Sequence, residues 1–433
     1  MDKVTIFWFR RDLRLSDNIG LYTAYENEKN ILPLFIFDED ILDKLENKKD
    51  ARVQFIHEQI NKLHEELKGY DSSILVRLGK PLSIFSELTK EFNILNVYTN
   101  RDYEPYARQR DEEVEKFLAN KDIPFYDFKD QVIFERDEIT NNEGSFYKVF
   151  TPYSKIWRQK LKNLTLALVN LDGRKKSFYK TKPLPLPSLK AIGFEKNPVE
   201  IPPLEIDEKL IQNYDTTRNF PARHGTSRLG IHLRFGTISI RQLVQEAVEL
   251  NGTYLNELIW REFYMMILYH KPTVIDTSFK EKYDRIMWKN DETAFTKWCN
   301  GKTGYPMVDA GMRELNSTGY MHNRVRMITA SFLTKHLLID WRWGEAYFAE
   351  KLLDFELSSN NGGWQWAAGT GTDAQPYFRI FNPESQMLKF DKEKKYIQKW
   401  IPEYGTPDYP EPIIEHKKAR ERALETYKEA LDK

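Results

Sequence analysis

The segment LLDFELSSNNGGWQWAAGTGTDAQPYFRIFNP carries the densest group of side chains that could do chemistry. Hydrogen-bonding groups stand beside large aromatic surfaces here, on Asp354, Glu356, Asn360, Trp364 and Trp366. Gly362 and Gly363 allow a backbone or a ligand to come close, at an entropic cost that an ordinary core has no reason to bear. Polar groups beside aromatic faces suit a flat ring with a hydrogen-bonding edge. The segment therefore predicts a site for a cofactor or a nucleobase.

A second group follows helical spacing in LNELIWREFYMMILYH. Positions i, i+3, i+4 and i+7 lie on one side of a helix, which brings together Glu257, Trp260, Arg261 and Tyr264. A carboxylate beside an indole suits a flat heterocycle, because the ring stacks while the acid hydrogen-bonds its edge. The alternative is a surface Glu–Arg pair next to a partly buried tryptophan, and the spacing alone favours that alternative.

The segment HNRVRMITASFLTKHLLIDW gives a third group. Four of its residues share one helix face: Asn323, Arg326, Met327 and Ala330. Arg324 lies on a different side of the helix. An arginine that binds phosphate and an asparagine that reads a base would suit these residue types. Ordinary surface positions of a core helix are the favoured interpretation of this segment alone.

A fourth group precedes a helical stretch and offers what an anionic phosphate needs, namely hydroxyls, arginines and backbone N–H groups. Its members are Tyr214, Arg218 and the loop GTSRLG at 225–230. A plain helix N-cap at Thr226 or Ser227 is the favoured interpretation of the loop by itself.

Aromatic residues are abundant, with 10 Trp, 23 Tyr and 26 Phe. Most of them are expected to fill cores. Oxidisable indoles can also relay an electron, and the tryptophans that could do so include Trp288, Trp341 and Trp364. Such a set is more often only part of a core.

The elements that must position these groups differ between the two halves of the chain. Over the first 130 or so residues, short apolar runs alternate with segments of helical period: VTIFWF, ILPLFIFD, SILVRLG, ILNVYTN and IPFYDF. This rhythm predicts an α/β domain with a Rossmann-like parallel sheet. No GxGxxG or P-loop pattern follows a predicted strand, so the usual nucleotide fingerprints are missing.

A proline-dense stretch, with KPLPLPSLK and IPPLE, disfavours helix interiors and central strands between about residues 176 and 203. Beyond it, helical periodicity dominates. We therefore predict an α/β domain at 1–130, an interdomain connector at 131–205 and a larger all-α domain at 206–433. A chain of 433 residues is too long for a single core, which agrees with this division.

The bulk composition excludes several classes of protein. No long apolar run is free of charges, and the apolar start runs into Arg10 and Arg11, so we expect no membrane span and no secretory signal. The single cysteine, Cys299, excludes a disulfide framework and any cysteine-based metal site, which fits a reducing compartment. We predict no metal and a cytoplasmic monomer. With 65 basic and 65 acidic residues, any contact with nucleic acid needs a local basic patch.

Four motifs together resemble the photolyase/cryptochrome family, and most closely the class I photolyases that split cyclobutane pyrimidine dimers. They are FWFRRDLRLSDN, ELIWREFY, KTGYPMVDAGMRELNSTGYMHNRVRMITASFL and NNGGWQWAAGTGTDAQPYFRIFNP, and the resemblance spans nearly the whole chain. It implies that the helical domain binds FAD, which after excitation by light gives an electron to a dimer flipped out of UV-damaged DNA. Given this resemblance, the purely structural interpretations of the four groups and of the tryptophans are no longer favoured.

The resemblance also implies residue roles. The positions that match FAD contacts are Tyr214, Thr226, Ser227, Arg228, Leu229, Tyr254, Arg326, Asp354, Glu356 and Asn360. The catalytic positions that it implies are Glu257 and Asn323, which hydrogen-bond the dimer, Trp260 and Trp366, which wall it, Met327, and Asn360, which matches the amide at the reactive ring nitrogen of the flavin. Positions near the DNA are Arg218, Arg261, Arg324 and Gln386, and an electron path to the surface corresponds to Trp364, Trp341 and Trp288.

Three departures from the family pattern affect what is expected. Gly230 stands where a serine is common, which removes one possible phosphate contact, and Glu356 is one methylene longer than the usual aspartate. Tyr106 and Ala107 stand where folate-binding members tend to place Asn and Glu. A methenyltetrahydrofolate antenna is therefore disfavoured, and a deazaflavin, a second flavin or no antenna are the alternatives.

Three other functions would fit part of the sequence. A cryptochrome-type blue-light receptor without repair activity is disfavoured by Asn360, where plant-type cryptochromes tend to carry Asp, and by the lack of a C-terminal signalling tail. An enzyme for (6-4) photoproducts typically has histidines where Asn323 and Met327 lie. An electron-transfer flavoprotein fits the sheet but not the helical motifs. Repair of cyclobutane dimers, as a deoxyribodipyrimidine photo-lyase, is the prediction.

Overall fold

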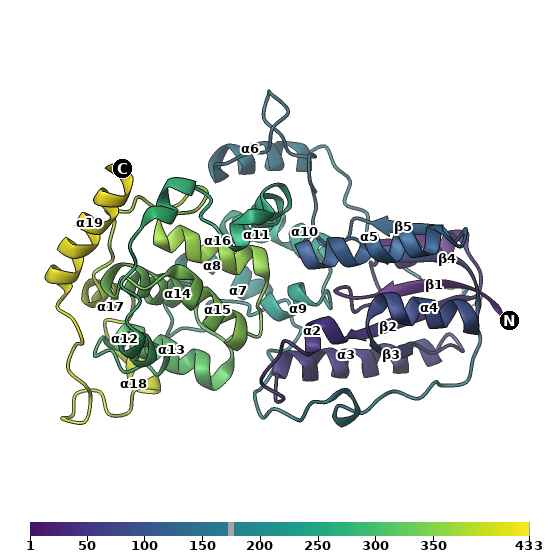
Figure 1. Ribbon diagram of the computed structural model, residues 1–433, viewed down its shortest axis with the longest axis horizontal. Coiled ribbons are helices and arrows are strands. Elements are labelled where there is room, and N and C mark those ends of the chain that lie inside the picture. The colour runs from purple at the N-terminus through teal and green to yellow at the C-terminus, as the bar shows by residue number, and fades with distance from the viewer. Residues whose placement is uncertain (172–176, 433) are drawn as a thin grey trace. The chain divides into compact units, whose positions relative to one another are not determined.

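A computed structural model of the chain describes residues 1–171 and 177–432 (Figure 1). The contacts divide them into two compact units. Unit 1 comprises residues 1–135, 163–204 and 229–246, and unit 2 comprises residues 136–162, 205–228 and 247–433. The domain limits predicted from the sequence, at residues 130 and 205, stay a prediction, and residues 172–176 of the predicted connector lie outside the described residues.

Unit 1 is built on a five-stranded parallel sheet with the strand order β3-β2-β1-β4-β5. The strands are β1 (Lys3–Phe9), β2 (Ile31–Asp38), β3 (Leu75–Gly79), β4 (Asn93–Asn100) and β5 (Phe125–Phe128). All five coincide with the apolar runs of the sequence, so the predicted parallel α/β sheet is confirmed. β1 and β2 are buried almost throughout, and strands that are covered on both faces read as continuous apolar runs.

Helices cover both faces of this sheet. The helices of unit 1 are α1 (Ile19–Asn27), α2 (Glu39–Leu42), α3 (Ala51–Lys68), α4 (Pro81–Glu91), α5 (Pro105–Ala119), η1 (Lys190–Ile192), α9 (Gly230–Arg234) and the start of α10 (Ile240–Leu250). Prolines open α4 and α5, where a missing N–H costs nothing. Phe85 of α4 and Val114 of α5 pack with Trp8 of β1 in one apolar cluster. On the other face Gly20 of α1 comes so close to Phe7 that a Cβ would lie 3.1 Å from its ring.

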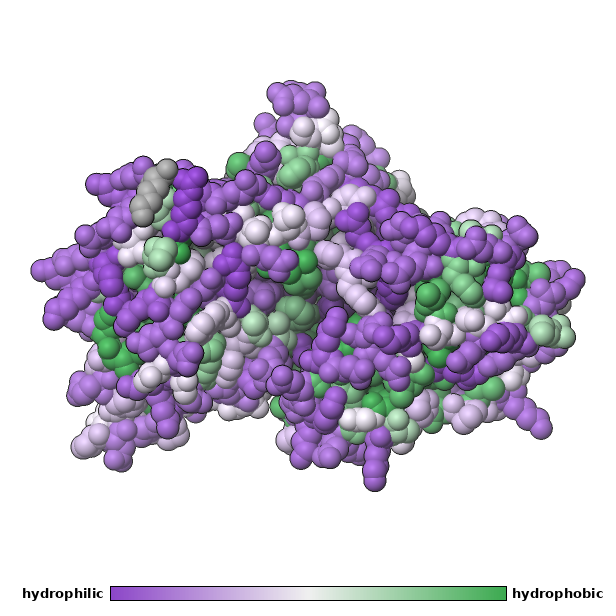
Figure 2. Space-filling model, viewed as in Figure 1, coloured by the Kyte–Doolittle hydropathy of each residue, from purple (hydrophilic) through white to green (hydrophobic). Residues whose placement is uncertain are grey.

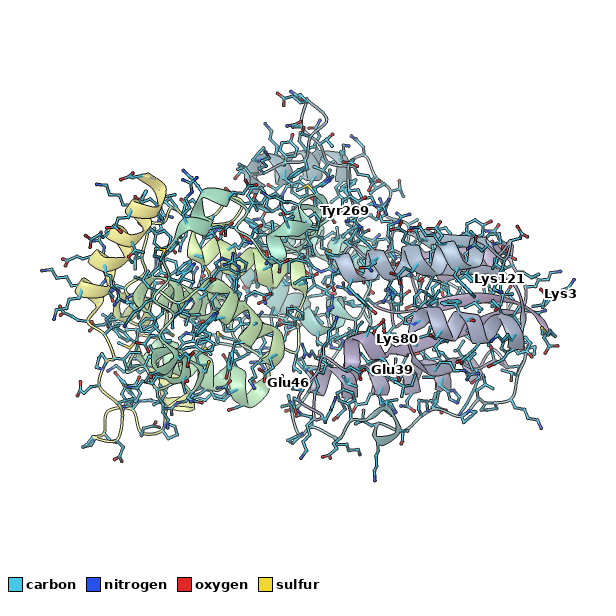
Figure 3. All side chains as sticks on the ribbon, in the orientation of Figure 1. Lys3, Glu39, Glu46, Lys80, Lys121 and Tyr269 are labelled. Atoms are coloured by element: carbon cyan, nitrogen blue, oxygen red, sulfur yellow. The ribbon has the colours of Figure 1, made fainter. Side chains whose placement is uncertain are left out.

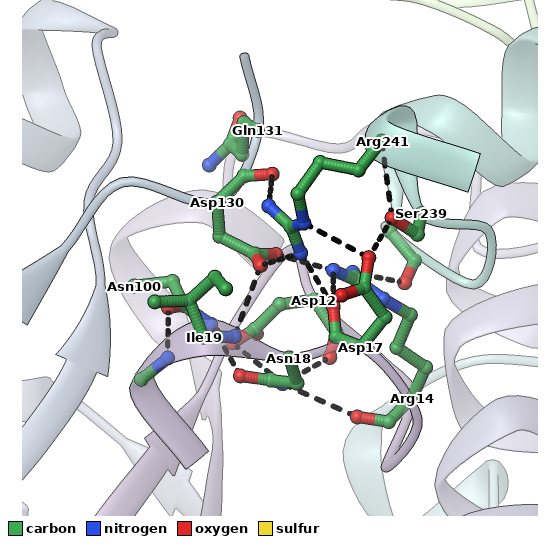
Figure 4. A network of polar contacts seen from close by, with 12 residues as sticks. Asp12, Arg14, Asp17, Asn18, Ile19, Asn100, Asp130, Gln131, Ser239 and Arg241 are labelled. Carbon is green, nitrogen blue, oxygen red and sulfur yellow. Dashed lines mark hydrogen bonds and ion pairs between the residues drawn. The ribbon is translucent and has the colours of Figure 1, made fainter. Parts of the chain in front are cut away.

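A buried ionic network joins residues 229–246 to the carboxyl end of the sheet (Figure 4). Arg241 pairs with Asp130 at 2.8 Å and with Asp17 at 2.9 Å, and Arg14 pairs with Asp130 at 2.7 Å. Burial alone would raise the pKa of Asp130, but Arg14 and Arg241 hold it below its usual range. Ser239 adds a hydrogen bond to the Asp17 carboxylate. The late segment is therefore a structural part of the α/β unit.

The visible surface is mostly hydrophilic (Figure 2). In unit 1, Lys80 pairs with Asp40 at 2.7 Å and lies near Glu39 (Figure 3). Solvent and salt screen such exposed pairs, so they contribute little to stability. Among the described residues, none of the helices combines the length and the apolar composition that a membrane span needs.

Unit 2 is helical, which confirms the predicted all-α domain. Its elements are α6 (Phe150–Leu161), α7 (Glu208–Gln212), α8 (Tyr214–Thr217), the remainder of α10, α11 (Gly252–His270), η2 (Pro272–Ile275), η3 (Glu281–Arg285), α12 (Glu292–Cys299), α13 (Pro306–Thr318), α14 (Asn323–Ser331), η4 (Phe332–His336), α15 (Trp341–Lys351), α16 (Leu357–Ala368), α17 (Pro383–Phe390), α18 (Lys395–Trp400) and α19 (His416–Asp432). Helices α13 to α16 pack around one apolar cluster.

Close helix approaches in unit 2 depend on glycines. A Cβ at Gly311 of α13 would lie 2.3 Å from Val325 of α14, and one at Gly344 of α15 would lie 2.1 Å from the ring of Trp364 in α16. No side chain fits at such distances, because real Cβ contacts are longer than 3.0 Å. These two glycines therefore fix how near α13 lies to α14 and α15 to α16.

Candidate cofactor and substrate cavity

A cavity of about 410 Å³ lies among α8, α11, α14 and α16 of unit 2. Twelve of the residues singled out from the sequence line it: Arg218, Glu257, Trp260, Arg261, Asn323, Arg326, Met327, Asp354, Glu356, Asn360, Trp364 and Trp366. Tyr264 and Ala330, the remaining members of the two helical stripes, line it as well. Helical spacing thus identified which side chains of α11 and α14 share a surface, and the fold turns these surfaces toward one another.

An ion pair crosses one wall of the cavity. The Arg326 guanidinium donates to both carboxylate oxygens of Asp354, at 2.9 and 3.1 Å, and its Nε donates to the Met321 carbonyl at 2.7 Å. Both bonds to Asp354 come from one nitrogen, Nη2, and they are charge-assisted. Burial would lower the pKa of Arg326, but Asp354 keeps it raised, so the guanidinium stays charged.

Glu257 pairs with Arg218, which precedes it by 39 residues. The two side chains are about one-quarter and one-third exposed, 23% for Arg218 and 32% for Glu257. Burial raises the pKa of Glu257, and Arg218 opposes that rise. This partner comes from the end of α8, and Glu257 lines the cavity.

The amide nitrogen of the Asn360 side chain donates hydrogen bonds within the protein. Its Nδ2 donates to the Glu345 carboxylate at 2.7 Å and to the Glu345 carbonyl at 3.1 Å. The amide oxygen is then the atom left to meet a ligand in the cavity. Burial raises the pKa of Glu345. Glu345 carries no sequence signal of this role, since only the packing of α15 on α16 brings it to Asn360.

Glu356 caps a helix. Its carboxylate accepts from the Ser359 amide at 3.0 Å and from the Ser359 hydroxyl at 2.9 Å, and it also accepts from Ser358, at the first turn of α16. Acids are favoured at this position because they satisfy the unpaired N–H groups and the positive end of the helix. The longer side chain at this departure from the family pattern thus holds the start of the helix that carries Asn360 and Trp364.

The hydroxyl-rich loop before α9 does not cap a helix. The Thr226 hydroxyl lies 2.9 Å from the Tyr320 hydroxyl, and the Ser227 hydroxyl lies 2.9 Å from that of Tyr254. Leu229 is the N-cap residue of α9, without a side-chain cap. The N-cap interpretation is therefore wrong, because these hydroxyls bond side chains far along the chain.

Aromatic rings surround that loop. Tyr214 and Tyr254 meet edge to face at 5.1 Å, and the Arg228 guanidinium lies 4.5 Å from the centre of the Tyr320 ring. Arg228 has φ of +54°, an uncommon conformation for a residue with a side chain. Sequence analysis missed Tyr320, although its hydroxyl belongs to this group.

The predicted DNA contacts Arg324 and Gln386 lie outside the cavity. Arg324 donates to the Asn219 side chain at 2.7 Å and covers the Phe390 ring at 4.6 Å. Gln386 is half-buried on α17, the helix that ends at Phe390. The position of Arg324 on a side of α14 different from Arg326 agrees with the helical spacing.

The three predicted electron-relay tryptophans differ in burial. Trp364 lines the cavity and is 2% exposed, Trp341 begins α15 and is 1% exposed, and Trp288 is half-buried, with its ring 5.9 Å from Tyr427. Trp364 also contacts Trp298 edge to face at 6.1 Å. Their use as a relay stays a prediction.

The antenna-related residues belong to unit 1. Tyr106 of α5 donates its hydroxyl to the Asp38 carboxylate at 2.7 Å, at the end of β2, and Ala107 is buried. The Arg110 guanidinium lies 5.0 Å from the centre of the Trp8 ring. The amide and carboxylate typical of the folate-binding pattern are thus replaced by a phenol that is bonded to the protein and by a small apolar side chain.

The residues of the cavity fit a flavin nucleotide. The cavity volume of about 410 Å³ lies within the range of roughly 300–1,000 Å³ that is typical of ligand pockets. At Gly363, which lines the cavity, a Cβ would meet nothing within 4 Å, so the wall is open there. The walls supply an indole for stacking, an amide oxygen for a ring edge and an arginine for negative charge.

Comparisons with known proteins extend over both units. Residues 5–171 match the family described as DNA photolyase, and residues 254–407 match the family described as the FAD binding domain of DNA photolyase. A deoxyribodipyrimidine photo-lyase of Synechococcus sp. is 38% identical over 454 residues, which cover 95% of this chain and 93% of that protein.

Solved structures give the same match. The class III photolyase from Agrobacterium tumefaciens has a TM-score of 0.88 and 31% identity, covering 100% of this chain and 98% of that chain. The archaeal photolyase from Sulfolobus tokodaii, solved with two FAD molecules, has a TM-score of 0.83 and 32% identity, covering 99% of this chain and 100% of that chain.

Proposed function

Because the chain belongs to the DNA photolyase family, we propose that it repairs cyclobutane pyrimidine dimers in UV-damaged DNA with light. The observation that carries this proposal is the meeting of two predicted residue sets in one cavity. The set expected to contact FAD contributes Arg326, Asp354 and Asn360, and the set expected to contact the dimer contributes Glu257 and Trp260. A donor and an acceptor bound in one cavity are close enough to exchange an electron.

Residues from several helices and loops would hold FAD. The Arg326–Asp354 pair offers a fixed charge and a carboxylate edge, and Asn360 offers its amide oxygen. Donors for phosphate would come from four hydroxyl groups and one guanidinium. They belong to Thr226, Ser227, Tyr254, Tyr214 and Arg228. Leu229 follows them in the chain. Reduced FAD, when bound, supplies on illumination the electron that opens the cyclobutane ring.

The chain's own groups would receive the dimer. Trp260 and Trp366 supply indole faces, beside which Met327 adds a soft apolar contact, and Glu257 and Asn323 supply hydrogen-bonding groups for the base edges. A flipped nucleotide costs a few kcal/mol of unstacking, and less at a damaged step. The Glu257 carboxylate, which Arg218 holds, offers an acceptor for an N–H group at a base edge.

Contacts with the DNA backbone would come from a small set of basic and polar residues, Arg218, Arg261, Arg324 and Gln386. Since the net charge is zero, the attraction for phosphate depends on such local groups. Trp364, Trp341 and Trp288 would carry electrons inward from the surface when oxidised flavin is reduced by light. We further propose a cytoplasmic monomer, and as antenna either a deazaflavin, a second flavin or none.

One experiment tests the proposal. Purified protein with reduced FAD is illuminated with blue or near-UV light together with an oligonucleotide that contains a single thymine dimer. We expect intact thymines to reappear only in the light, and Glu257→Ala to lower the affinity for the dimer. A dark reaction, or no recovery of thymine under light with FAD bound and reduced, would refute repair. Tight, dimer-specific binding without recovery would favour a receptor of cryptochrome type.

A further inference from the structure

The rear face of Trp260 is covered by a second ring. Phe150, the first residue of α6, stacks on the Trp260 indole with ring centres 3.7 Å apart and planes 5° apart. Phe150 is 6% exposed. Trp260 lines the cavity and Phe150 does not. Phe150 therefore covers one face of the Trp260 indole, and the rest of the indole is left to line the cavity.

This stack needs support from its surroundings. Aromatic pairs prefer offset or edge-to-face contacts with centres about 4.5–7 Å apart, and a near-parallel contact at shorter distance is not the arrangement two rings choose freely. Phe263 meets both rings edge-on, with centres 5.7 Å from Phe150 and 5.6 Å from Trp260. Neighbouring groups must then hold Phe150 where it is.

Asp373 anchors the backbone of Phe150. Its Oδ2 accepts the Phe150 amide at 3.0 Å, while Val149, the N-cap residue of α6, provides no side-chain cap. The acceptor for the first N–H of the helix thus comes from the loop after α16. Next to it, Thr372 donates its hydroxyl to the Lys148 carbonyl at 2.7 Å. The loop that follows Trp366 therefore sets the start of α6.

Further contacts fix α6 along α11. Glu262, which is buried, accepts from the Tyr153 hydroxyl at 3.3 Å and from the Trp157 indole. Arg158 donates to the Gly252 carbonyl at 2.9 Å, at the first residue of α11. The helix is held at its start, middle and end, so Phe150 cannot shift without breaking buried hydrogen bonds.

We propose that Phe150, held by Asp373, is a positioning residue for the dimer. It fixes the plane of Trp260, so that the indole offers one preformed face to the lesion. The proposal rests on the proposed repair function of the same cavity and adds a residue that contacts neither the dimer nor FAD. A preorganised surface binds more tightly because no ordering is needed at the moment of binding.

Three variants test this role. Phe150→Leu removes the stack, Asp373→Gly removes the anchor while glycine tolerates the φ of +43° at that position, and Phe150→Tyr keeps the ring. Phe146→Leu is the matched control, since Phe146 stacks on His270 (4.7 Å, 4°) at the far end of α11, where Figure 3 labels Tyr269. Each protein is loaded with FAD and compared with the wild type.

The primary measurement is the dissociation constant in the dark for an oligonucleotide with one thymine dimer and for its undamaged counterpart. We expect Phe150→Leu to weaken dimer binding about 10-fold, within the roughly 5- to 150-fold that loss of a base–aromatic stack represents. Asp373→Gly should act in the same direction, and Phe150→Tyr and Phe146→Leu should bind like the wild type. Binding of undamaged DNA and photoreduction of bound flavin should not change.

A double-variant cycle with Trp260→Leu separates positioning from general damage to the fold. If Phe150 acts through Trp260, Phe150→Leu adds little once the indole is gone. Full additivity, or an equal loss in Phe146→Leu, would overturn the proposal. If Phe150→Leu does not fold, Asp373→Gly and the Phe150→Tyr rescue give the same decision. Failure of the wild type to distinguish dimer from undamaged DNA would instead refute the proposed function.

Discussion

Two adjacent glycines in α16 face opposite surroundings, and identical substitutions there should have opposite effects. At Gly362 an added Cβ would lie 2.2 Å from the Tyr264 ring, whereas at Gly363 it would meet nothing within 4 Å and would enter the cavity. Both positions are inside the helix, so replacing either glycine by alanine gains about 1 kcal/mol of helix propensity. Only Gly362→Ala must also displace a buried ring, which costs roughly 1–3 kcal/mol or more.

Gly363→Ala should therefore stabilise the FAD-free protein by about 1 kcal/mol, which corresponds to roughly 2–4 °C in Tm for a domain of 150–250 residues. Gly362→Ala should leave it no more stable than the wild type, and less stable when the ring cannot move. The added methyl at Gly363 projects into the space proposed for FAD, so the same variant should bind FAD more weakly.

The assay is thermal unfolding followed by circular dichroism on FAD-free protein, together with fluorescence titration of FAD. Gly363→Ala should raise Tm without FAD and lose that advantage at saturating FAD if it raises the Kd for FAD by about 5-fold or more, because a ligand stabilises by RT ln(1 + [L]/Kd). Equal destabilisation of the FAD-free protein by both variants would refute the argument from the open wall. Unchanged FAD affinity in Gly363→Ala would show that FAD does not occupy this part of the cavity.

Three further outcomes are expected. Trp364→Phe should slow photoreduction of oxidised flavin, measured by absorbance under light, while repair by pre-reduced protein stays nearly intact; equal loss of both would contradict the relay. Burial lowers the pKa of His322 to about 4 and that of His336 to about 3, below the usual 6.5, so the unfolded chain binds protons more readily. Stability in urea should then fall as the pH drops from about 6.5 towards 4, and His336→Phe should reduce this slope by up to about 1.4 kcal/mol per pH unit; an unchanged slope would contradict the assignment. Glu356→Ala should lose about 0.5–2 kcal/mol in the same assay through loss of the α16 cap, whereas Glu356→Asp, which keeps a favoured cap acid, should lose less; equal losses would contradict the capping role.

The strands and the helical stripes were predictable because their signals are local. An apolar run such as ILPLFIFD is buried on both faces, and it coincides with β2 from Ile31 to Asp38. The stripe from Glu257 to Tyr264 shares one side of α11 by geometry alone, and all four of its members line the cavity.

Partners across long sequence distances were not predictable from such signals. Arg218 lies 39 residues before Glu257, and Glu345 lies 15 residues before Asn360. Spacing within one helix cannot show which helix packs against it. The same limit explains the N-cap interpretation of Thr226, since its hydroxyl meets Tyr320, 94 residues away.

The role of Phe150, which lies in the predicted connector at 131–205, was also not predictable from local spacing. Its segment carries no glycine-rich or charged signature, and its role depends on a stack with a residue 110 positions later, which helical period cannot reveal. Proline density marked the region between the two predicted domains, but α6 within it packs on α11 by buried hydrogen bonds.

The ionic network at the carboxyl end of the sheet has a consequence for the order of synthesis. Asp17 and Asp130 are both buried, and Arg241, one of their partners, emerges from the ribosome more than a hundred residues after Asp130. At 5–20 residues per second this delay is on the order of ten seconds. Until then the nascent α/β unit holds carboxylates without their full complement of positive charge, which disfavours complete burial. The first strands to be translated thus belong to a unit that closes only after part of the helical half has been made.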